Sequence, residues 1–417
     1  MAEIDVSPVA EKRDTKTVCL IACTSRKGLY PAPAEFIYRS PLFAAGRSYA
    51  EHRTDRWFIL SAKHGLLLPG EQIAPYNESL HDIDDAGRES WARKVHRQLK
   101  SRIDSKADVV FLAGATYRSH LEPLLQAAGH RTAAPMSFLG IGSQVAWLQK
   151  VAKNEVRLRD MDLFYALLKR LCICQGGSSS VLSRHTAKSV RPKRGIYFFF
   201  EPGERRMTAP FEDRVTRIGT HSVSIGSKAT LWGRLRTHRG GTGGTGNHRG
   251  SIFRLHVGEC LIRKAELEGL FPLWGVGQSV PREVRDGELE IETEVSRLIG
   301  DMGVLWLDVS DDASADSDRA YLERNLIALL TGPQGPVDLP SDNWLGRWST
   351  RDAVRSSGLW NVNHVYEAYD RDVLKVLEEY VEIAEGSRAS DGQSRARQGW
   401  RLRALEARSG NPQIDLI

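Results

Sequence analysis

The chain has 417 residues, an apolar fraction of 41% and a net charge of +6, so it can bury the cores of two or three domains and is only mildly basic as a whole. No run of eighteen apolar residues occurs, which argues against a membrane span, and the N-terminal residues lack the hydrophobic run of a signal peptide. The five cysteines follow neither a CxxC pattern nor a Cys/His zinc spacing, so reduced thiols in a cytoplasmic protein are expected.

The first 150 residues alternate strand-like and helix-like segments, which is typical of an α/β domain. Continuous apolar runs, the pattern of strands buried on both faces, occupy Thr17–Cys23, Arg56–Ala62 and Asp108–Ala113. Helical periodicity falls between and after them, at Pro41–His52, Ala86–Ile103 and His120–Ala128. This order predicts a mostly parallel sheet with right-handed crossovers.

Polar residues follow each of these predicted strands, and ligands of parallel sheets bind beyond the carboxyl ends of the strands. The residues that could contact a ligand there are Ser25, Arg26, Lys63, His64, Tyr76 and Tyr117. The alternative is that Lys63 and His64 belong to an ordinary turn that caps a helix or faces water.

Four segments of this half, CTSRKG, YRSPLF, LSAKHGLLLP and FLAGATYRSHL, resemble a bacterial domain family of uncharacterised function that is linked to peroxide-stress and deazaguanine-modification proteins. The resemblance implies a domain that recognises a DNA base or excises a modified one. A base turned out of a duplex needs an aromatic ring to stack on and polar groups for its edge, so the six residues named above become candidate base-binding residues.

In the second half, Gly195–Phe200 and Arg214–Gly219 predict two adjacent antiparallel strands, and Ser227–His238 predicts a short helix. Arg234 and His238 are four residues apart, so they share one face of that helix. An Arg and a His presented beside a strand pair form a possible phosphate-handling surface.

These residues resemble the GIY-YIG nuclease family, in the segments Gly195-Ile196-Tyr197, Arg217-Ile218-Gly219 and Arg234 to His238. A strand over Val304–Val309, a helix with Glu323 three residues before Leu326-Ile327, and Asn343 after Pro340 follow in the order of the family. The resemblance covers roughly residues 190–345, and it implies an α+β domain with a small antiparallel sheet and C-terminal helices. One departure stands out, because Arg217 replaces the first tyrosine of YIG.

The resemblance also implies roles in metal-dependent cleavage of DNA. Glu323 would bind a divalent metal ion, magnesium or manganese, and Arg234 would hold the scissile phosphate, which the fork of a guanidinium suits. Tyr197 or His238 would take a proton from water, His238 having the better ordinary pKa for this, and Arg217 would add a second phosphate clamp. The candidate catalytic residues are thus Tyr197, Arg217, Arg234, His238, Glu323 and Asn343. Glu292 and Glu294 rival Glu323, and Asn361 and Asn363 rival Asn343.

Basic residues concentrate in the segment from Arg184 to Gly258, where fifteen Lys and Arg face four Asp and Glu, a net charge of +11. Such an excess attracts a polyanion, and DNA is the expected partner, with Arg194, Arg236, Arg239 and Arg249 as candidate contacts. A solvated basic face is the alternative. The glycine-rich run Gly240–Gly246 contains GxGxxG, but it follows a helix and leads into a predicted strand, Ser251–Val257, so it is rejected as a dinucleotide site.

The expected organisation is an α/β domain over residues 1–175, closed by a helix over 153–175, a linker over 176–190 and a GIY-YIG-like domain over 191–417. The last has an insertion over 259–302 and C-terminal helices at Tyr366–Ala384 and Gln393–Arg408. The expected function is DNA processing, with a glycosylase or a non-catalytic DNA-binding module as alternatives. The oligomeric state, and a role in repair or in phage defence, stay open.

Overall fold

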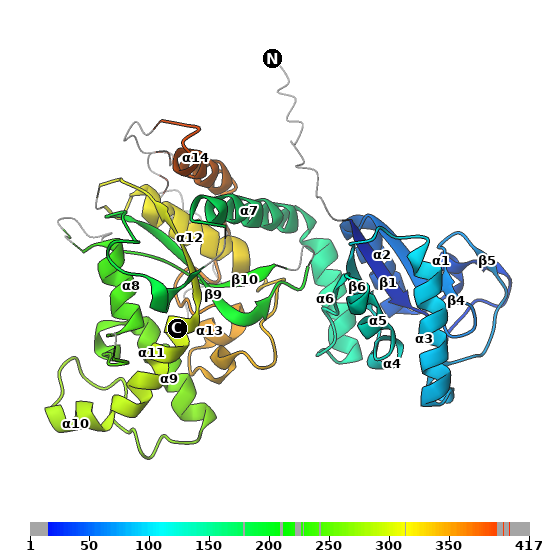
Figure 1. Ribbon diagram of the computed structural model, residues 1–417, viewed down its shortest axis with the longest axis horizontal. Coiled ribbons are helices and arrows are strands. Elements are labelled where there is room, and N and C mark those ends of the chain that lie inside the picture. Colours follow the sequence, from blue (N-terminus) through cyan, green and yellow to red (C-terminus); the bar gives the residue numbers. More distant parts are fainter. Residues whose placement is uncertain are drawn as a thin grey trace, which may run out of the picture. The chain divides into compact units, whose positions relative to one another are not determined.

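The computed structural model describes residues 16–177, 180–208, 212–221, 227, 229–241, 243–312, 314–389, 395 and 400. The chain divides into two compact units, shown in Figure 1. The first unit comprises Met1–Asn154 and Met207–Glu212, and the second comprises Glu155–Arg206 and Asp213–Ile417.

The first unit is built on a five-stranded sheet with the order β4-β3-β1-β6-β7. Its strands are β1 (Thr17–Ala22), β3 (Arg56–Ser61), β4 (Gly65–Leu67), β6 (Asp108–Leu112) and β7 (Arg131–Ala133). All pairs are parallel except β3 with β4, which confirms the predicted, mostly parallel sheet. A separate pair joins β2 (Ala32–Pro33) to β5 (Gln72–Ile73).

Helices cover both faces of this sheet, because successive residues of a buried strand point to opposite sides. Leu20 of β1 packs in one core with residues of α3 and α5, whereas Ile21 lies against Gly46 of α2. The helices are α1 (Ala34–Ile37), α2 (Pro41–Arg53), α3 (Asp85–Lys100), α4 (Ala115–Arg118), α5 (Leu121–Ala127) and α6 (Ile141–Lys153), with a 3-10 turn, η1 (Leu80–Asp82). Ser40 and Asp84 cap α2 and α3 through their side chains.

The second unit contains a four-stranded antiparallel sheet with the order β10-β9-β11-β8. The strands are β8 (Ser180–Val181), β9 (Gly195–Arg205), β10 (Asp213–Thr220) and β11 (Gly303–Asp308). The β9–β10 pairing sets Tyr197 opposite Gly219 and Phe199 opposite Arg217. These four residues therefore share one face of the sheet. Strand β10 is an edge strand.

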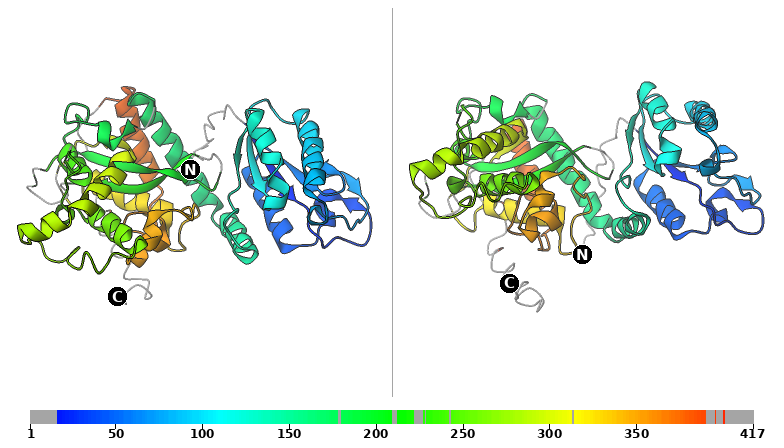
Figure 2. Two further views of the ribbon diagram at one scale, coloured as in Figure 1. Left: turned by 60° about the horizontal axis from the view of Figure 1, so that its bottom comes forward. Right: turned by 90° about the horizontal axis from the view of Figure 1, so that it is seen from below.

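Two helical layers enclose this sheet (Figures 1 and 2). On the Tyr197 face lie α8 (Leu231–Arg239), α9 (Ile252–Lys264) and α11 (Leu289–Asp301), which share a buried core with Tyr197 and Phe199. On the opposite face lie α7 (Glu155–Cys174), α12 (Asp318–Thr331) and α14 (Val373–Glu385), where the Phe164 and Phe198 rings meet at 5.8 Å. Shorter elements are η2 (Leu182–Arg184), η3 (His248–Gly250), α10 (Arg282–Gly287), η4 (Leu345–Trp348) and α13 (Asp352–Ser357).

Three expectations differ from this architecture. The strand predicted over Ser251–Val257 is wrong, because these residues begin helix α9. The helix predicted from Tyr366 begins only at Val373. The helix over 153–175 belongs to the second unit rather than the first, since Arg157 donates hydrogen bonds to carbonyl oxygens at the end of α12.

The helix predicted over Gln393–Arg408 lies outside the described residues, apart from Arg395 and Trp400. Among the described helices, none is both long enough and apolar enough to cross a membrane.

Candidate active site

A buried chain of three side chains starts on β9 and ends at the first turn of α9. The Tyr197 hydroxyl is hydrogen-bonded to His238 Nε2 at 2.8 Å, and His238 Nδ1 is hydrogen-bonded to Ser251 Oγ at 2.8 Å. Ser251 is also the N-cap of α9, where its Oγ accepts from the Arg254 amide. Burial, together with the positive charges of Arg217, Arg234 and Arg254, lowers the pKa of His238 well below its ordinary value. The imidazole is therefore neutral at pH 7.

The two motif glycines allow close approaches that a side chain would block. A Cβ on Gly219 would overlap the Tyr197 hydroxyl and ring, and a Cβ on Gly195 would overlap the Leu307 carbonyl of β11. Gly219 thus leaves the space in which the Tyr197 hydroxyl meets His238, and Gly195 lets β9 and β11 pair.

Arg217, which stands where the family motif has a tyrosine, is buried on the same face as Tyr197. Its guanidinium lies 4.7 Å from the centre of the Phe253 ring, and its Nη1 donates to the Trp360 carbonyl. Its Nε has no hydrogen-bond partner among the residues that the structure describes. Arg217 therefore brings a full positive charge into the core beside His238.

Arg234 lies on α8, one turn before His238, and is half-buried. Within the described ranges its guanidinium makes no hydrogen bond and no ion pair. Its charge nevertheless lowers the pKa of His238, of His221 and of Glu323. Arg234 is thus a cation near Tyr197, Arg217, His238 and Glu323, which are called the cluster below, and it is free to bind an anion.

Glu323 reaches the same cluster from the other helical layer. Helix α12 packs on the opposite face of the sheet from α8, but the Glu323 carboxylate extends to edge strand β10, where Oε1 accepts from the Thr220 amide at 3.3 Å. Burial raises the pKa of Glu323 above its ordinary value, while the charges of Arg217, His364 and Arg234 oppose that rise. Because Arg217 and Arg234 act on both Glu323 and His238, the two groups share one electrostatic environment at the edge of β10.

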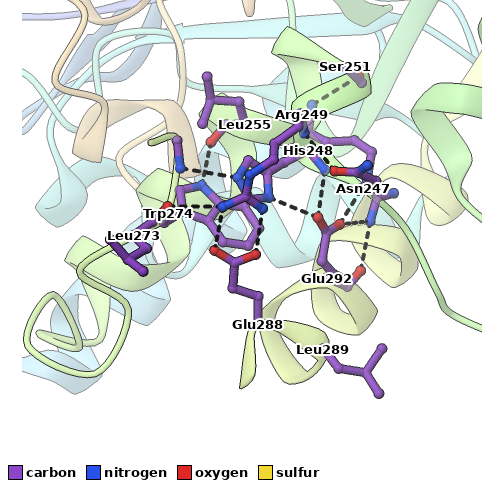
Figure 3. A network of polar contacts seen from close by, with 12 residues as sticks. Asn247, His248, Arg249, Ser251, Leu255, Leu273, Trp274, Glu288, Leu289 and Glu292 are labelled. Atoms are coloured by element: carbon purple, nitrogen blue, oxygen red, sulfur yellow. Dashed lines mark hydrogen bonds and ion pairs between the residues drawn. The ribbon is translucent and has the colours of Figure 1, made fainter. Parts of the chain in front are cut away.

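The rival carboxylates are occupied by other partners. Glu292 accepts from the His248 amide at 2.6 Å, from His248 Nδ1 at 2.9 Å and from Arg254 Nε at 3.0 Å, as Figure 3 shows for His248. Burial raises the pKa of Glu292, but these hydrogen bonds and the charge of Arg254 more than offset it, so the net pKa is lowered. Glu294 forms an exposed ion pair with Arg297. Neither carboxylate is free for a metal ion.

Of the three candidate asparagines, Asn361 lies at the cluster. Its Nδ2 donates to the Ile218 carbonyl at 2.8 Å and its Oδ1 accepts from the Ile218 amide at 3.1 Å, so it pairs with β10 between Arg217 and Gly219. Asn343 and Asn363 are exposed, and neither makes a hydrogen bond with a described residue.

Two histidines that the sequence did not single out flank the cluster. His364 is half-buried and has a positive φ of 67°, which is uncommon for a residue other than glycine, and its Nδ1 lies 3.0 Å from Glu367 Oε1. His221, directly after β10, donates from Nε2 to the Lys193 carbonyl at 3.1 Å. Burial, with the charges of Arg319, Arg234 and Arg194, lowers the pKa of His221 to about 4. No local motif marks either residue, because tertiary packing alone brings them here.

The four arginines predicted to contact DNA differ in whether their side chains are already bound to other residues. Arg236 is exposed, Arg194 contacts Asp311 and Asp312, and Arg239 donates to the His185 carbonyl at 2.8 Å. Arg249 is a correction, because its side chain is buried in a bidentate ion pair with Glu288, at 2.6 and 2.9 Å (Figure 3).

Exposed cations lie instead on the segment before β9, namely Arg184, Lys188, Arg191 and Lys193. This segment runs beside α8, because the Leu231 amide donates to the Lys193 carbonyl at 2.9 Å.

A divalent ion fits Glu323 on the chemistry of the donors present. In the described part of the chain there is no group of three or more His, Cys, Asp or Glu side chains that could form an all-protein metal site. Magnesium commonly uses one or two carboxylates, with water and substrate phosphate as its other ligands. The Glu323 carboxylate is suited to this kind of site because it is largely unbonded. Its one hydrogen bond within the described ranges is the long one from the Thr220 amide.

The first unit carries a second cluster, at the carboxyl ends of its strands. The Tyr76 hydroxyl is hydrogen-bonded to the Tyr38 hydroxyl and to Ser61 Oγ, each at 2.8 Å, and the His64 ring meets the Tyr76 ring edge-on at 5.4 Å. The Lys63 ammonium lies 5.9 Å from the centre of the Tyr76 ring and pairs with Glu78 at 3.1 Å. The structure thus brings Lys63, His64 and Tyr76 together.

Tyr117 enters this strand-end cluster from the short helix α4. Its hydroxyl is hydrogen-bonded to Cys23 Sγ at 3.1 Å, which links the segments after β6 and β1. The chain leaves these two neighbouring strands in opposite directions, to β7 and to β3, and such a switch point is where sheets of this kind bind ligands. The side chains of Ser25 and Arg26 are exposed and form no hydrogen bond or ion pair with a described residue.

Comparison with known proteins divides the chain in the same way. The family described as "GIY-YIG domain" matches residues 155–386, and the family described as "Family of unknown function (DUF6884)" matches residues 18–150. A Bacillus subtilis (strain 168) protein, "Uncharacterized protein YfjM", is 29% identical over 154 residues, which are 34% of this chain and 99% of that protein. No solved structure matches.

Proposed function

The chain belongs to the GIY-YIG family, and from this premise we propose that its second unit hydrolyses DNA phosphodiester bonds with a divalent metal ion, magnesium or manganese, while its first unit recognises a base or another DNA feature. Family membership supports a nuclease-type, DNA-processing function. The metal dependence, the residue roles and the task of the first unit are the substance of the proposal.

One observation carries it: Glu323 and the Tyr197–His238 pair, which come from opposite helical layers, lie within the field of the same two arginines at the edge of β10. A phosphodiester cleavage site needs a carboxylate for the metal, a cation for the phosphate and a path for the proton of water. Side chains suited to these three requirements lie around one strand edge, which supports the proposal.

In the proposed mechanism Arg234 binds the scissile phosphate, because its guanidinium is half-exposed and has no partner in the described part of the chain. Arg217 adds a fixed positive charge beneath the phosphate. A metal ion held by Glu323 would neutralise charge on the phosphate and assist the leaving oxygen.

Proton transfer falls to Tyr197 in this proposal rather than to His238 directly. His238 has no exposed surface and its pKa is lowered, so it is a poor acceptor of a proton from bulk water. It can accept the hydroxyl proton of Tyr197 at Nε2 if Nδ1 carries the hydrogen shared with Ser251. Tyr197 is also buried, so the proposal requires that its hydroxyl becomes accessible when DNA binds.

The base-recognising role of the first unit is supported by its strand-end cluster, which offers the aromatic ring of Tyr76 beside His64 and Lys63. Aromatic rings stack on a base that has left the duplex, and adjacent polar groups can bond its edge.

The test is cleavage of labelled plain and base-modified duplex DNA by the full chain, with magnesium, manganese or EDTA. We expect metal-dependent cutting that Glu323→Gln reduces to the level seen in EDTA while DNA affinity is largely kept. Glu294→Gln is the matched control, because Glu294 is paired with Arg297 on the surface, and it should cut normally.

Cutting that survives Glu323→Gln would remove Glu323 from the site. Release of a base in EDTA without strand cutting would favour a glycosylase, and tight binding without any product would favour a DNA-binding module.

A further inference from the structure

The loop after β1 in the first unit presents a lysine that is held firmly in place. Lys27 pairs with Tyr38 in an isolated antiparallel bridge, the Gly28 amide donates to the Ile37 carbonyl at 2.6 Å, and the Arg39 amide donates to the Arg26 carbonyl at 2.8 Å. Main-chain bonds on both sides of Lys27 therefore fix the direction in which its side chain leaves the loop.

The Lys27 side chain lies in the strand-end cluster rather than in solvent. Its ammonium lies 4.1 Å from the centre of the Tyr76 ring and 5.8 Å from that of Tyr38, and the residue is half-buried. Its ammonium forms no ion pair and no hydrogen bond with any residue that the structure describes. Lys63, on the same ring, differs because it is paired with Glu78.

Burial makes Lys27 easier to deprotonate than an exposed lysine. Burial lowers the pKa of Lys27, and the neighbouring Cys23 and Glu78 only partly oppose this. Burial also raises the pKa values of Tyr38, Tyr76 and Tyr117, so these hydroxyls stay protonated and can donate hydrogen bonds. A lysine with a lowered pKa beside proton donors is the arrangement that attacks carbonyl carbons.

We propose that Lys27 is an amine nucleophile that forms an imine with the aldehyde of an abasic site in DNA, which gives the first unit a metal-independent strand-cutting activity. The inference rests on the proposed handling of DNA by the first unit. Intact DNA has no carbonyl carbon open to an amine in this way, whereas the sugar of an abasic site exposes one at C1′.

The reaction balances without an oxidant or a reductant. The Lys27 nitrogen bonds to C1′, and the carbonyl oxygen leaves as water after taking one proton from the amine and one from solvent. The resulting iminium makes the C2′ proton acidic. Loss of that proton to water and cleavage of the C3′–O bond release the 3′ phosphate with the bonding electron pair.

The experiment uses the full chain in EDTA with a 5′-labelled duplex that contains a single abasic site, and sodium borohydride to reduce the imine to a stable secondary amine. We expect a covalent protein–DNA adduct whose cross-linked peptide contains Lys27. Lys27→Gln should lower the adduct to the level of heat-denatured protein. Lys16→Gln, at the other end of β1 where Lys16 pairs with Asp104, should leave it unchanged.

An adduct of equal yield in Lys27→Gln, or no adduct with the unaltered chain, would overturn the inference. Circular dichroism and a thermal unfolding curve check that Lys27→Gln is folded, because cutting by the second unit does not report on the first. EDTA separates the two proposals, because the adduct needs no metal ion. If the nuclease proposal fails, the adduct experiment can therefore still be interpreted.

Discussion

At the scale of single residues, Arg217 changes the electrostatics of a site whose motif otherwise follows the family. A tyrosine there would supply a neutral hydroxyl, whereas Arg217 supplies a buried charge that acts on both His238 and Glu323. The substitution thus favours an ionised Glu323 and a neutral His238, which are the states that the proposed reaction needs.

Replacement of Arg217 should therefore move the pH dependence of cutting. Glu323 must be ionised to bind a metal ion, so activity should fall as the pH drops through the raised pKa of Glu323. Arg217→Gln removes a charge that lowers this pKa, and the acidic limb of the pH–rate profile should shift to higher pH. The measurement is kcat/KM for metal-dependent cutting between pH 5 and pH 8. An unshifted acidic limb would show that Arg217 does not act on the metal-binding group.

His221 should make the second unit less stable in acid. Its pKa is about 4 in the fold and near 6.5 in an unfolded chain, so between these values the unfolded chain binds more protons and stability falls as the pH falls. His221→Gln keeps a donor for the Lys193 carbonyl but cannot titrate. Between pH 7 and pH 4 the variant should lose about 1–2 kcal/mol less unfolding free energy than the unaltered chain, a figure reduced for solvent screening. Denaturant titrations at each pH would measure the difference, and parallel curves would contradict it.

At the scale of elements, one side chain at the start of α9 serves both the helix and the candidate site. Ser251 Oγ caps α9 and is hydrogen-bonded to His238. Ser251→Ala should therefore cost about 1 kcal/mol of stability as the cap is removed. It should also lower cutting, since His238 Nδ1 loses its partner. Chemical denaturation and kcat would report the two effects separately.

Ser317→Ala is the matched control for this prediction. Ser317 caps α12 by accepting from the Ala320 amide, and it has no contact with His238. A similar loss of stability with normal cutting is expected. Equal loss of cutting in both variants would mean that the Ser251 effect is one of stability alone.

Local patterns predicted most elements of the sheet cores and the face of α8, because buried strands and short amphipathic helices carry their signal within a few residues. The wrong prediction of a strand over residues 251–257 also came from a pattern within a few residues. From Phe253 to Val257 the apolar residues alternate with polar ones, as in a strand, whereas the helical spacing of the buried residues Phe253, Val257 and Cys260 needs a longer window.

Only some residues of the candidate site could be selected from the sequence. Tyr197, Arg234, His238 and Glu323 stand in motifs that lie on single elements. Asn361 was only one of three asparagines that the sequence left open, and His364 was not singled out, because both reach the cluster through a tertiary segment that runs along β10. The ion pair that buries Arg249 was equally invisible, since Glu288 lies far along the chain.

At the scale of the whole molecule, the basic segment should govern how strongly the chain holds DNA rather than how fast it cuts. Removing one cation that neutralises a DNA phosphate should reduce the slope of log affinity against log salt by about 0.9. Combined Lys188→Gln, Arg191→Gln and Lys193→Gln substitutions should thus flatten the slope and weaken binding, with kcat at saturating DNA unchanged. Affinity measured between about 50 and 200 mM salt tests this.

Arg282→Gln with Arg285→Gln, on the exposed α10, provides the control and should keep the original slope. A slope that the triple variant leaves unchanged would place the DNA track elsewhere on the chain.

The amide of Asn361 also has a consequence for how copies of this chain behave toward one another. By bonding both main-chain groups of Ile218, it occupies hydrogen-bonding positions that an exposed strand would offer to a foreign strand. The Trp360 amide does the same for the Thr216 carbonyl. The side of β10 that borders the cluster is thereby closed to β-augmentation at Thr216 and Ile218, and we expect this to limit strand-by-strand aggregation in concentrated solutions of the protein.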